Sequence, residues 1–241
     1  MEGVRLPQKE MLLLEDFVSR LKKIYDDDLV SAILYGSAAS GEFTERHSNI
    51  NLLIVLRDTS LGALSKAHGL VRSPCFKAIN PIFFTEDYIK RSADVFPIEF
   101  LDMKENYTVL HGKDLLKDLK VDTRNLRFQC EQELKSKLIT VKRRYLESSS
   151  QKELEDLLFK TFTSCLHIMR NLLRIKGSEP PYLKVCILSE IEKEFSVDTT
   201  ILNEILWAKT KKMKLSHSDV DALLIGFVKE LEAITAIIDR L

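Results

Sequence analysis

Two short polar motifs near the start of the chain have the residue types and spacing of a ligand site. The first is Gly36-Ser37, which ends an apolar, partly β-branched run over residues 30–35. Because glycine lacks a Cβ, another backbone or a phosphate can come close to it, and we interpret Gly36-Ser37 as a phosphate-binding turn. The second is Asn49 and Asn51, which are two residues apart, so in a strand both side chains leave the same face. Such amides can donate hydrogen bonds to a phosphate or accept them from a base.

The elements that must position these motifs are two predicted strands. Residues 29–35 form the first apolar run, and residues 50–56 form the second. A polar loop that contains Gly41 connects them. This order of strand, glycine turn, loop and strand brings the two asparagines close to Ser37.

At these residues the chain resembles the nucleotidyltransferase superfamily, the group that contains DNA polymerase beta and kanamycin nucleotidyltransferase. The family pattern is Gly-Ser, a short loop, and then Asp-x-Asp at the start of a strand. Here G-S-A-A-S-G-E-F matches the family's G-S-x-A-x-G-E, and S-N-I-N-L-L-I-V-L matches S-D-I-D-L-L-V-V-L. Both aspartates are replaced, by Asn49 and Asn51. The resemblance therefore implies the family fold with a neutralised metal-binding pair.

The resemblance also implies a set of site residues. In active relatives three carboxylates hold Mg²⁺ ions that bridge a nucleoside triphosphate, and Asn49 and Asn51 occupy two of these positions. We assign the third to Glu99, on a strand predicted over residues 95–103. Asp102 competes for that position, but its spacing to Glu105 favours a helix-capping box.

Nucleotide binding is assigned, again by resemblance, to the turn formed by Gly36, Ser37 and Gly41. Mg²⁺ prefers anionic oxygens, so replacing two carboxylates by neutral amides removes most of the attraction for the metal. We therefore expect a nucleotidyltransferase-like protein that is catalytically impaired or inactive and retains binding of a nucleotide or a partner.

The alternative is an active Mg²⁺-dependent enzyme that transfers a nucleoside monophosphate to a hydroxyl of a small molecule or protein. In that alternative Glu99, the asparagines and the substrate phosphates hold the metal. Whether the chain is an enzyme stays open at this stage, as does whether it uses Mg²⁺ and a nucleoside triphosphate or no cofactor.

Beyond residue 112 the pattern changes to helices, which predicts an α+β protein. We expect a nucleotidyltransferase-like mixed sheet with helices over residues 1–115 and an α-helical bundle over residues 116–241. A helix over residues 151–175 carries a wide apolar arc, shorter helices follow near residues 183–194 and 201–212, and Ser218 with Asp221 caps the last helix. A nucleotide or small-molecule ligand is expected in the cleft between the two domains. The wide arcs predict tight packing on the sheet domain, or a homodimer or protein partner through the bundle.

Composition limits the remaining classes of function. The chain has 241 residues, 45% of them apolar and 30% charged, with 36 basic and 36 acidic residues. This balance argues against nucleic acid as the main partner, because phosphate binding needs a concentrated basic face. Its 4 cysteines form no C-x-x-C pair, which argues against a zinc knuckle. No apolar run approaches the roughly 20 residues that span a bilayer, and the N-terminus lacks a signal-peptide core, so we expect a cytoplasmic protein.

Overall fold

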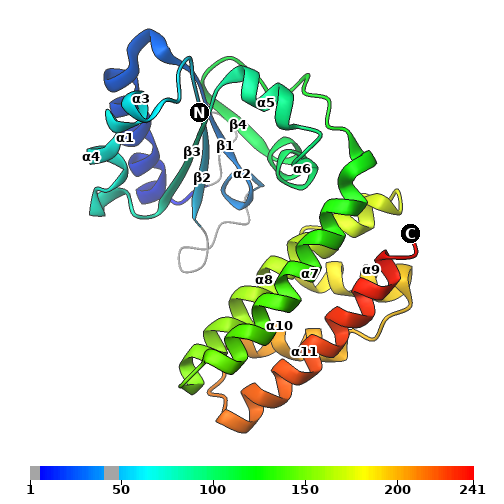
Figure 1. The fold of residues 1–241 in the computed structure, drawn as a ribbon. Coiled ribbons are helices and arrows are strands. Elements are labelled where there is room, and N and C mark those ends of the chain that lie inside the picture. The colour runs from blue at the N-terminus through cyan, green and yellow to red at the C-terminus, as the bar shows by residue number, and fades with distance from the viewer. Residues whose placement is uncertain (1–5, 41–48) are drawn as a thin grey trace. The chain divides into compact units, whose positions relative to one another are not determined.

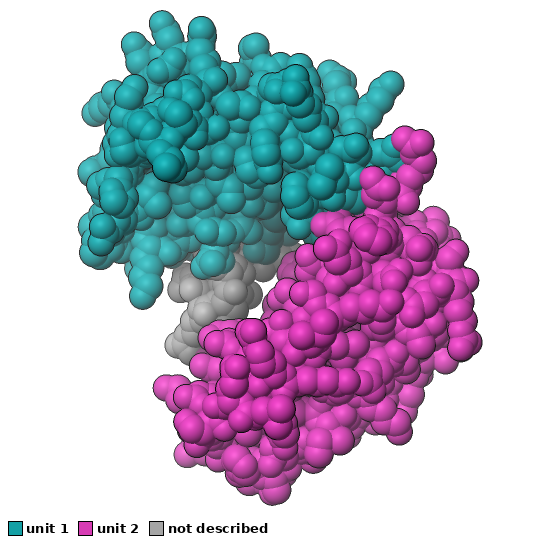
Figure 2. All heavy atoms as spheres, in the orientation of Figure 1, with its two compact units in different colours: residues 1–122 teal, residues 123–241 magenta. Residues whose placement is uncertain are grey.

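The chain divides into two compact units in the computed structural model, which describes residues 6–40 and 49–241. Unit 1 comprises residues 1–122 and unit 2 comprises residues 123–241 (Figure 2). This division lies later than the predicted one after residue 115. Leu116 and Leu119, which the prediction placed in the helical domain, are buried in a core of unit 1.

Figure 1 shows the elements of each unit. In unit 1 they are, in chain order, α1 (Gln8–Tyr25), η1 (Asp26–Asp28), β1 (Leu29–Tyr35), α2 (Ser37–Ser40), β2 (Ile50–Leu56), α3 (Leu61–Ser65), α4 (His68–Val71), η2 (Pro74–Phe76), β3 (Ile79–Phe84), α5 (Glu86–Ser92), α6 (Pro97–Glu105) and β4 (Tyr107–Gly112). In unit 2 they are η3 (Thr123–Asn125), α7 (Leu126–Glu147), α8 (Gln151–Ile175), α9 (Lys184–Phe195), α10 (Thr200–Lys211) and α11 (His217–Ile238).

The four strands form one mixed sheet in the order β3-β2-β1-β4. β1 pairs antiparallel with both β2 and β4, whereas β2 pairs parallel with β3. Helices cover both faces: α1, α3 and α4 lie on one side, and α5 and α6 lie on the other (Figure 1). A mixed sheet with helices followed by helices alone confirms the predicted α+β class.

Alternation along β1 and β2 divides the core of unit 1 between the two faces. Leu34, Leu52 and Ile54 face α1 and pack with its Leu14 and Phe17. Their chain neighbours on the other face join a second cluster with side chains of α5 and α6, and its buried members include Ile33, Leu53, Val55, Ile89, Phe100 and Met103. Because β1 and β2 are buried on both faces, their sequences are nearly continuous apolar runs.

The strand predicted over residues 95–103 is wrong. This segment contains α6, with Pro97 in its first turn, where the missing N–H and the fixed φ of proline suit a helix. Asp102 and Glu105 lie inside this helix, so the predicted capping box is wrong as well. The fourth strand is β4, which follows directly and pairs with β1.

One hydroxyl and one glycine fix where β4 ends. Ser31 is fully buried, and its Oγ lies 3.1 Å from the carbonyl oxygen of His111 and 2.7 Å from that of Lys113. Between them Gly112 has φ +77°, and a Cβ there would lie 2.0 Å from the carbonyl oxygen of Val30. Only glycine allows β4 to approach β1 this closely.

Unit 2 is built around α8, whose wide apolar arc is buried. α8 packs against α7, α9 and α11, and its Phe162 meets Phe227 of α11 edge to face, with ring centres 6.2 Å apart. The apolar arc is therefore covered within unit 2 itself.

The capping box of α11 is formed by Ser216 and Asp219, two residues before the predicted pair. Within the described parts of the chain, no helix is both long and apolar enough to cross a membrane.

Candidate functional site

The Gly-Ser turn lies where the central strand β1 ends. Gly36 follows β1 with φ +74°, a backbone conformation that favours glycine, and Ser37 begins the single turn of α2. The N–H of Gly36 donates to the carbonyl oxygen of Asn106 at 3.1 Å, and its carbonyl accepts from Ala39 and Ser40. The Gly36 N–H is therefore used within the protein. The assignment of phosphate binding to the Gly36-Ser37 turn stays a prediction, and its donors would be groups other than this N–H.

Asn51 lies beside this turn on β2. It is paired across the strands with Tyr35, and a Cβ on Gly36 would lie 3.4 Å from Asn51 Nδ2. Across the parallel pair, Asn80 on β3 is the register partner of Asn51, and its Nδ2 donates to Asn51 Oδ1 at 3.3 Å. This bond between two amides brings a third asparagine to the end of the sheet where the turn lies.

Asn80 is the functional candidate that sequence reasoning missed. It stands one residue before Pro81 in an apolar strand, and it is exposed while Ile79 before it is buried. A polar residue inside such a strand, with the predicted register of two parallel strands, is the signal that points to it. No short motif marks the position.

Two tyrosines adjoin the turn on the face of Asn51. Tyr35 and Tyr107 are cross-strand neighbours on β1 and β4, and both pack against the α5 and α6 cluster. Burial raises the pKa of Tyr35 to about 12. Burial also raises the pKa of Tyr107, as does the hydrogen bond from its hydroxyl to Asp114 Oδ2 at 3.1 Å. Both phenols are therefore protonated at neutral pH and can act as hydrogen-bond donors but not as bases.

The structure does not test the roles of the other predicted site residues. Asn49 is exposed immediately before β2, and Gly41 lies outside the described residues. Glu99 is an exposed residue of α6 and not part of a strand. α6 does lie on the face of the sheet that carries Asn51, because its Phe100 packs in the cluster of that face. The roles assigned to Asn49, Gly41 and Glu99 remain predictions.

Comparison with known proteins decides the fold. In sequence, the chain matches no protein-family model and no curated protein. In structure, it is similar to a spectinomycin adenyltransferase from Enterococcus faecialis that was crystallised with ATP and spectinomycin. The similarity covers 90% of this chain and 98% of the other, with a TM-score of 0.58 and 11% sequence identity. The chain has a nucleotidyltransferase fold.

A second structure, a nucleotidyltransferase-like protein from Exiguobacterium sibiricum, is less similar. It shares 12% identity over 91% of this chain and 75% of its own, with a TM-score of 0.36. Assignment of the nucleotidyltransferase fold therefore rests on the first similarity.

The donors at the end of this sheet do not fit the Mg²⁺ ions that the nucleotidyltransferase fold implies. Asn49, Asn51 and Asn80 are neutral amides, and Asn51 Oδ1 already accepts a hydrogen bond from Asn80. A donor N–H beside that oxygen repels a cation, and amide dipoles attract Mg²⁺ far less than carboxylates do. Among residues 6–40 and 49–241, no three His, Cys, Asp or Glu side chains form a group that could hold a metal ion.

Proposed function

We propose that this protein uses its nucleotidyltransferase fold to bind a nucleotide, and that it transfers nucleotides little or not at all. The observation that supports the proposal is the hydrogen bond between Asn80 and Asn51, since Asn51 is one of the positions to which the family resemblance assigns a metal-binding carboxylate. A nucleotidyl transfer that depends on Mg²⁺ needs charged oxygens at that place, because the metal supplies most of the charge stabilisation in the transition state.

Nucleotide binding needs only hydrogen-bonding groups, whereas nucleotidyl transfer also needs the metal. The hydrogen bond uses Asn51 Oδ1 and one N–H of Asn80, which leaves Asn51 Nδ2 as a donor beside Gly36 and Asn80 Oδ1 as an acceptor. Paired donors and acceptors of this kind suit the hydrogen-bonding groups of a nucleobase, a ribose or a phosphate. The hydroxyl of Ser37, next to Gly36, adds a further donor at the same end of the sheet.

ATP is the first nucleotide to test, since the Enterococcus adenyltransferase was crystallised with ATP and a small-molecule substrate. Calorimetric titration of the full chain with ATP, with and without Mg²⁺, measures binding directly. We expect the same affinity in both conditions within about threefold, since no metal contributes to binding, and a threefold change corresponds to roughly 0.7 kcal/mol. The three other ribonucleoside triphosphates then define base preference.

Matched variants locate the binding. Asn51→Ala should weaken ATP binding by about tenfold, which is the usual effect of losing hydrogen bonds to a charged or polar ligand. Asn203→Ala serves as the control, because Asn203 is an exposed asparagine of α10 in unit 2 whose side chain bonds Thr199. Equal effects of the two substitutions would count against a site at Asn51.

A transfer assay with radiolabelled ATP tests the second half of the proposal. We expect no label on small hydroxylated acceptors or on the protein itself, whether Mg²⁺ or Mn²⁺ is present. Robust turnover by the unmodified protein would overturn the proposal and establish the active nucleotidyltransferase instead.

A further inference from the structure

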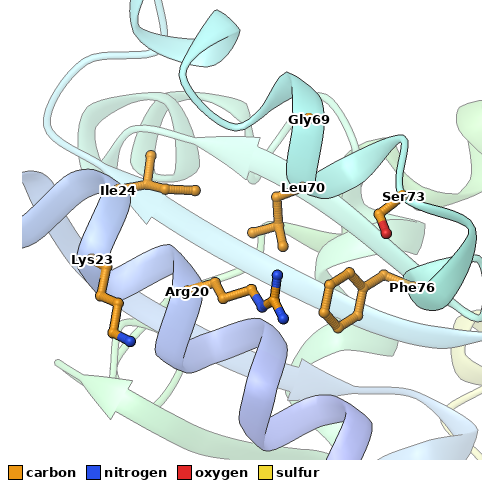
Figure 3. Close-up of a pocket in the computed structure, with 7 residues that line it drawn as sticks. All are labelled: Arg20, Lys23, Ile24, Gly69, Leu70, Ser73 and Phe76. Atoms are coloured by element: carbon orange, nitrogen blue, oxygen red, sulfur yellow. The ribbon is translucent and has the colours of Figure 1, made fainter.

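A cavity of about 350 Å³ opens on the face of the sheet that α1 covers. Figure 3 shows it between the second half of α1 and the segment of α4 and η2. The residues that line it are Arg20, Lys23, Ile24, Gly69, Leu70, Ser73 and Phe76. Leu70 and Phe76 belong to the cluster of Leu52 and Ile54, whereas Asn51 points to the opposite face. The cavity is therefore separate from the asparagine site, and its size is that of small-molecule sites in general.

The floor of the cavity is apolar and one wall carries a positioned cation. Leu70 is 8% exposed and Phe76 is 3% exposed, so both are fixed by the core beneath them. The guanidinium carbon of Arg20 lies 5.4 Å from the centre of the Phe76 ring. Figure 3 shows this side chain extended along the cavity toward the ring. An arginine over an aromatic face is held by the ring quadrupole and keeps its outer amino groups available.

The hydrogen bonds of Arg20 leave those amino groups open. Its Nε donates to both carboxylate oxygens of Asp16, at 3.0 and 3.2 Å. Within the part of the chain that the structure describes, neither terminal amino group of Arg20 has a hydrogen-bond acceptor. Asp16 thus orients the guanidinium from one side, and the donors on its other side face the cavity.

The segment opposite α1 is strongly biased in charge. Between Asp58 and Glu86 the sequence carries Lys66, Arg72 and Lys77 and has no aspartate or glutamate. This cationic stretch occurs in a protein whose formal net charge is zero. The two charged residues that line the cavity, Arg20 and Lys23, are also cationic, and charges of one sign raise the local concentration of ligands of the opposite sign.

We propose that this cavity binds a small organic anion with a flat apolar body. The body packs against Ile24 and Leu70, and the anionic group accepts hydrogen bonds from the terminal amino groups of Arg20, which lies over Phe76. Ser73 contributes a hydroxyl at the rim. This site does not depend on nucleotide binding at Asn51, so either proposal can fail without the other.

A pair of fluorescent probes tests the chemistry of the ligand. Anilinonaphthalene sulfonate has an aromatic body with an anionic group, and N-phenylnaphthylamine has the same rings without the sulfonate. Titration of the full chain should show saturable binding of the sulfonate and binding of the neutral amine that is weaker by about tenfold, the effect of a charge-assisted hydrogen bond. Equal affinities would overturn the anionic part of the proposal, and no saturable binding would overturn all of it.

Two glycines provide a matched test of the location. Gly69 lines the cavity, and a Cβ there would meet nothing within 4 Å, so Gly69→Leu adds bulk at the cavity without a clash. Gly62 in α3 is exposed as well, and a Cβ there would be 3.9 Å from Ser60 Oγ, which is an ordinary contact. We expect Gly69→Leu to abolish saturable sulfonate binding and Gly62→Leu to leave it unchanged. Unchanged binding in Gly69→Leu would mean that the probe binds elsewhere, which overturns the proposal.

The role of Arg20 is tested on the same helix. Arg20→Gln should weaken sulfonate binding by about tenfold and leave binding of the neutral probe unchanged, because only the anion uses the guanidinium. Lys22→Gln, at an exposed residue of α1 that does not line the cavity, removes the same charge as a control. Equal losses in both variants would show a diffuse charge effect and overturn the assignment to Arg20.

Two exposed cysteines give an independent readout. Cys75 lies in the chain between Ser73 and Phe76, which both line the cavity, whereas Cys186 belongs to unit 2. Bound sulfonate should slow alkylation of Cys75 by iodoacetamide in proportion to occupancy and leave Cys186 unaffected. Protection of Cys186 alone, or of neither, would contradict binding at this cavity.

Discussion

Asn80 Nδ2 donates to Asn51 Oδ1 at 3.3 Å across the parallel strands β2 and β3. The bond gives the end of the sheet beside Gly36 a neutral pair of amides that share one hydrogen bond. A cation has little to gain there, because both side chains are neutral and Asn80 directs an N–H group at the oxygen of Asn51.

Restoring carboxylates should restore metal binding. We expect Asn49→Asp combined with Asn51→Asp to raise the affinity for Mn²⁺ by at least about tenfold, because carboxylates attract a divalent ion by several kcal/mol more than amides do even at an effective dielectric of about 20. Calorimetric titration with Mn²⁺ measures the change, and Asn125→Asp combined with Asn203→Asp, at two exposed positions of unit 2, is the charge-matched control. An affinity equal to that of the unmodified protein would show that these two positions do not face a common site.

Two glycines should differ sharply in their tolerance of a side chain. Gly112→Ala forces a Cβ to within 2.0 Å of the carbonyl oxygen of Val30 and should cost about 4 kcal/mol or more, or prevent folding. Gly36→Ala suffers only from its positive φ, because its Cβ would make an ordinary contact at 3.4 Å, and should cost about 1–2 kcal/mol. Urea denaturation gives both values. A smaller loss for Gly112→Ala than for Gly36→Ala would contradict the close approach of β4 to β1.

Tyr35 should make unit 1 less stable at high pH. Its pKa is about 12 in the folded protein and 10.0 for an ordinary tyrosine, so the unfolded chain loses this proton first as the pH rises. The free energy of unfolding should therefore fall between pH 10 and pH 12, by at most about 2.7 kcal/mol, and titration of Tyr35 should not change it well below pH 10. Denaturation of Tyr35→Phe and of the unmodified protein on both sides of pH 10 measures the difference. A parallel decline in the two proteins would assign the loss to other groups.

Phe162 and Phe128 provide a matched pair in unit 2. Phe162 is 1% exposed and packs on Phe227, whereas Phe128 on α7 is 62% exposed. Phe162→Ala should cost about 3–5 kcal/mol because it leaves a cavity, and Phe128→Ala should change stability by less than about 1 kcal/mol. Thermal unfolding followed by circular dichroism distinguishes the two. If Phe128→Ala were the more costly, α7 would have to be covered by a partner in solution.

Much of the fold was predictable because it depends on local periodicity. Continuous apolar runs located β1 and β2, and helical spacing located long helices of unit 2, with ends displaced by a few residues. The segment around Pro97 misled because its apolar residues fit a strand as well as a short helix, and only packing on the sheet decides between them. β4 was missed because a partner distant in sequence, β1, stabilises it.

The candidate site was predictable only where one stretch of chain supplied it. Gly36, Ser37 and Asn51 belong to one motif, and the structure brings Gly36 and Asn51 together. Asn80 comes from another strand, and its role depends on the register between β2 and β3, which the sequence does not encode locally. For the same reason the sequence could not show that Asn106 would take the N–H of Gly36.

The contacts that Ser31 and Gly112 make where β4 ends determine the order in which unit 1 can fold during synthesis. The hydroxyl of Ser31 lacks its acceptors until the carbonyls of His111 and Lys113 have been synthesised. The N–H of Gly36 likewise lacks its acceptor until the carbonyl of Asn106 is present. A ribosome-bound chain that ends before residue 106 therefore contains the whole Gly-Ser motif but cannot close its turn. Nascent fragments should become resistant to protease only after β4 and the following Leu116 and Leu119 have emerged from the exit tunnel.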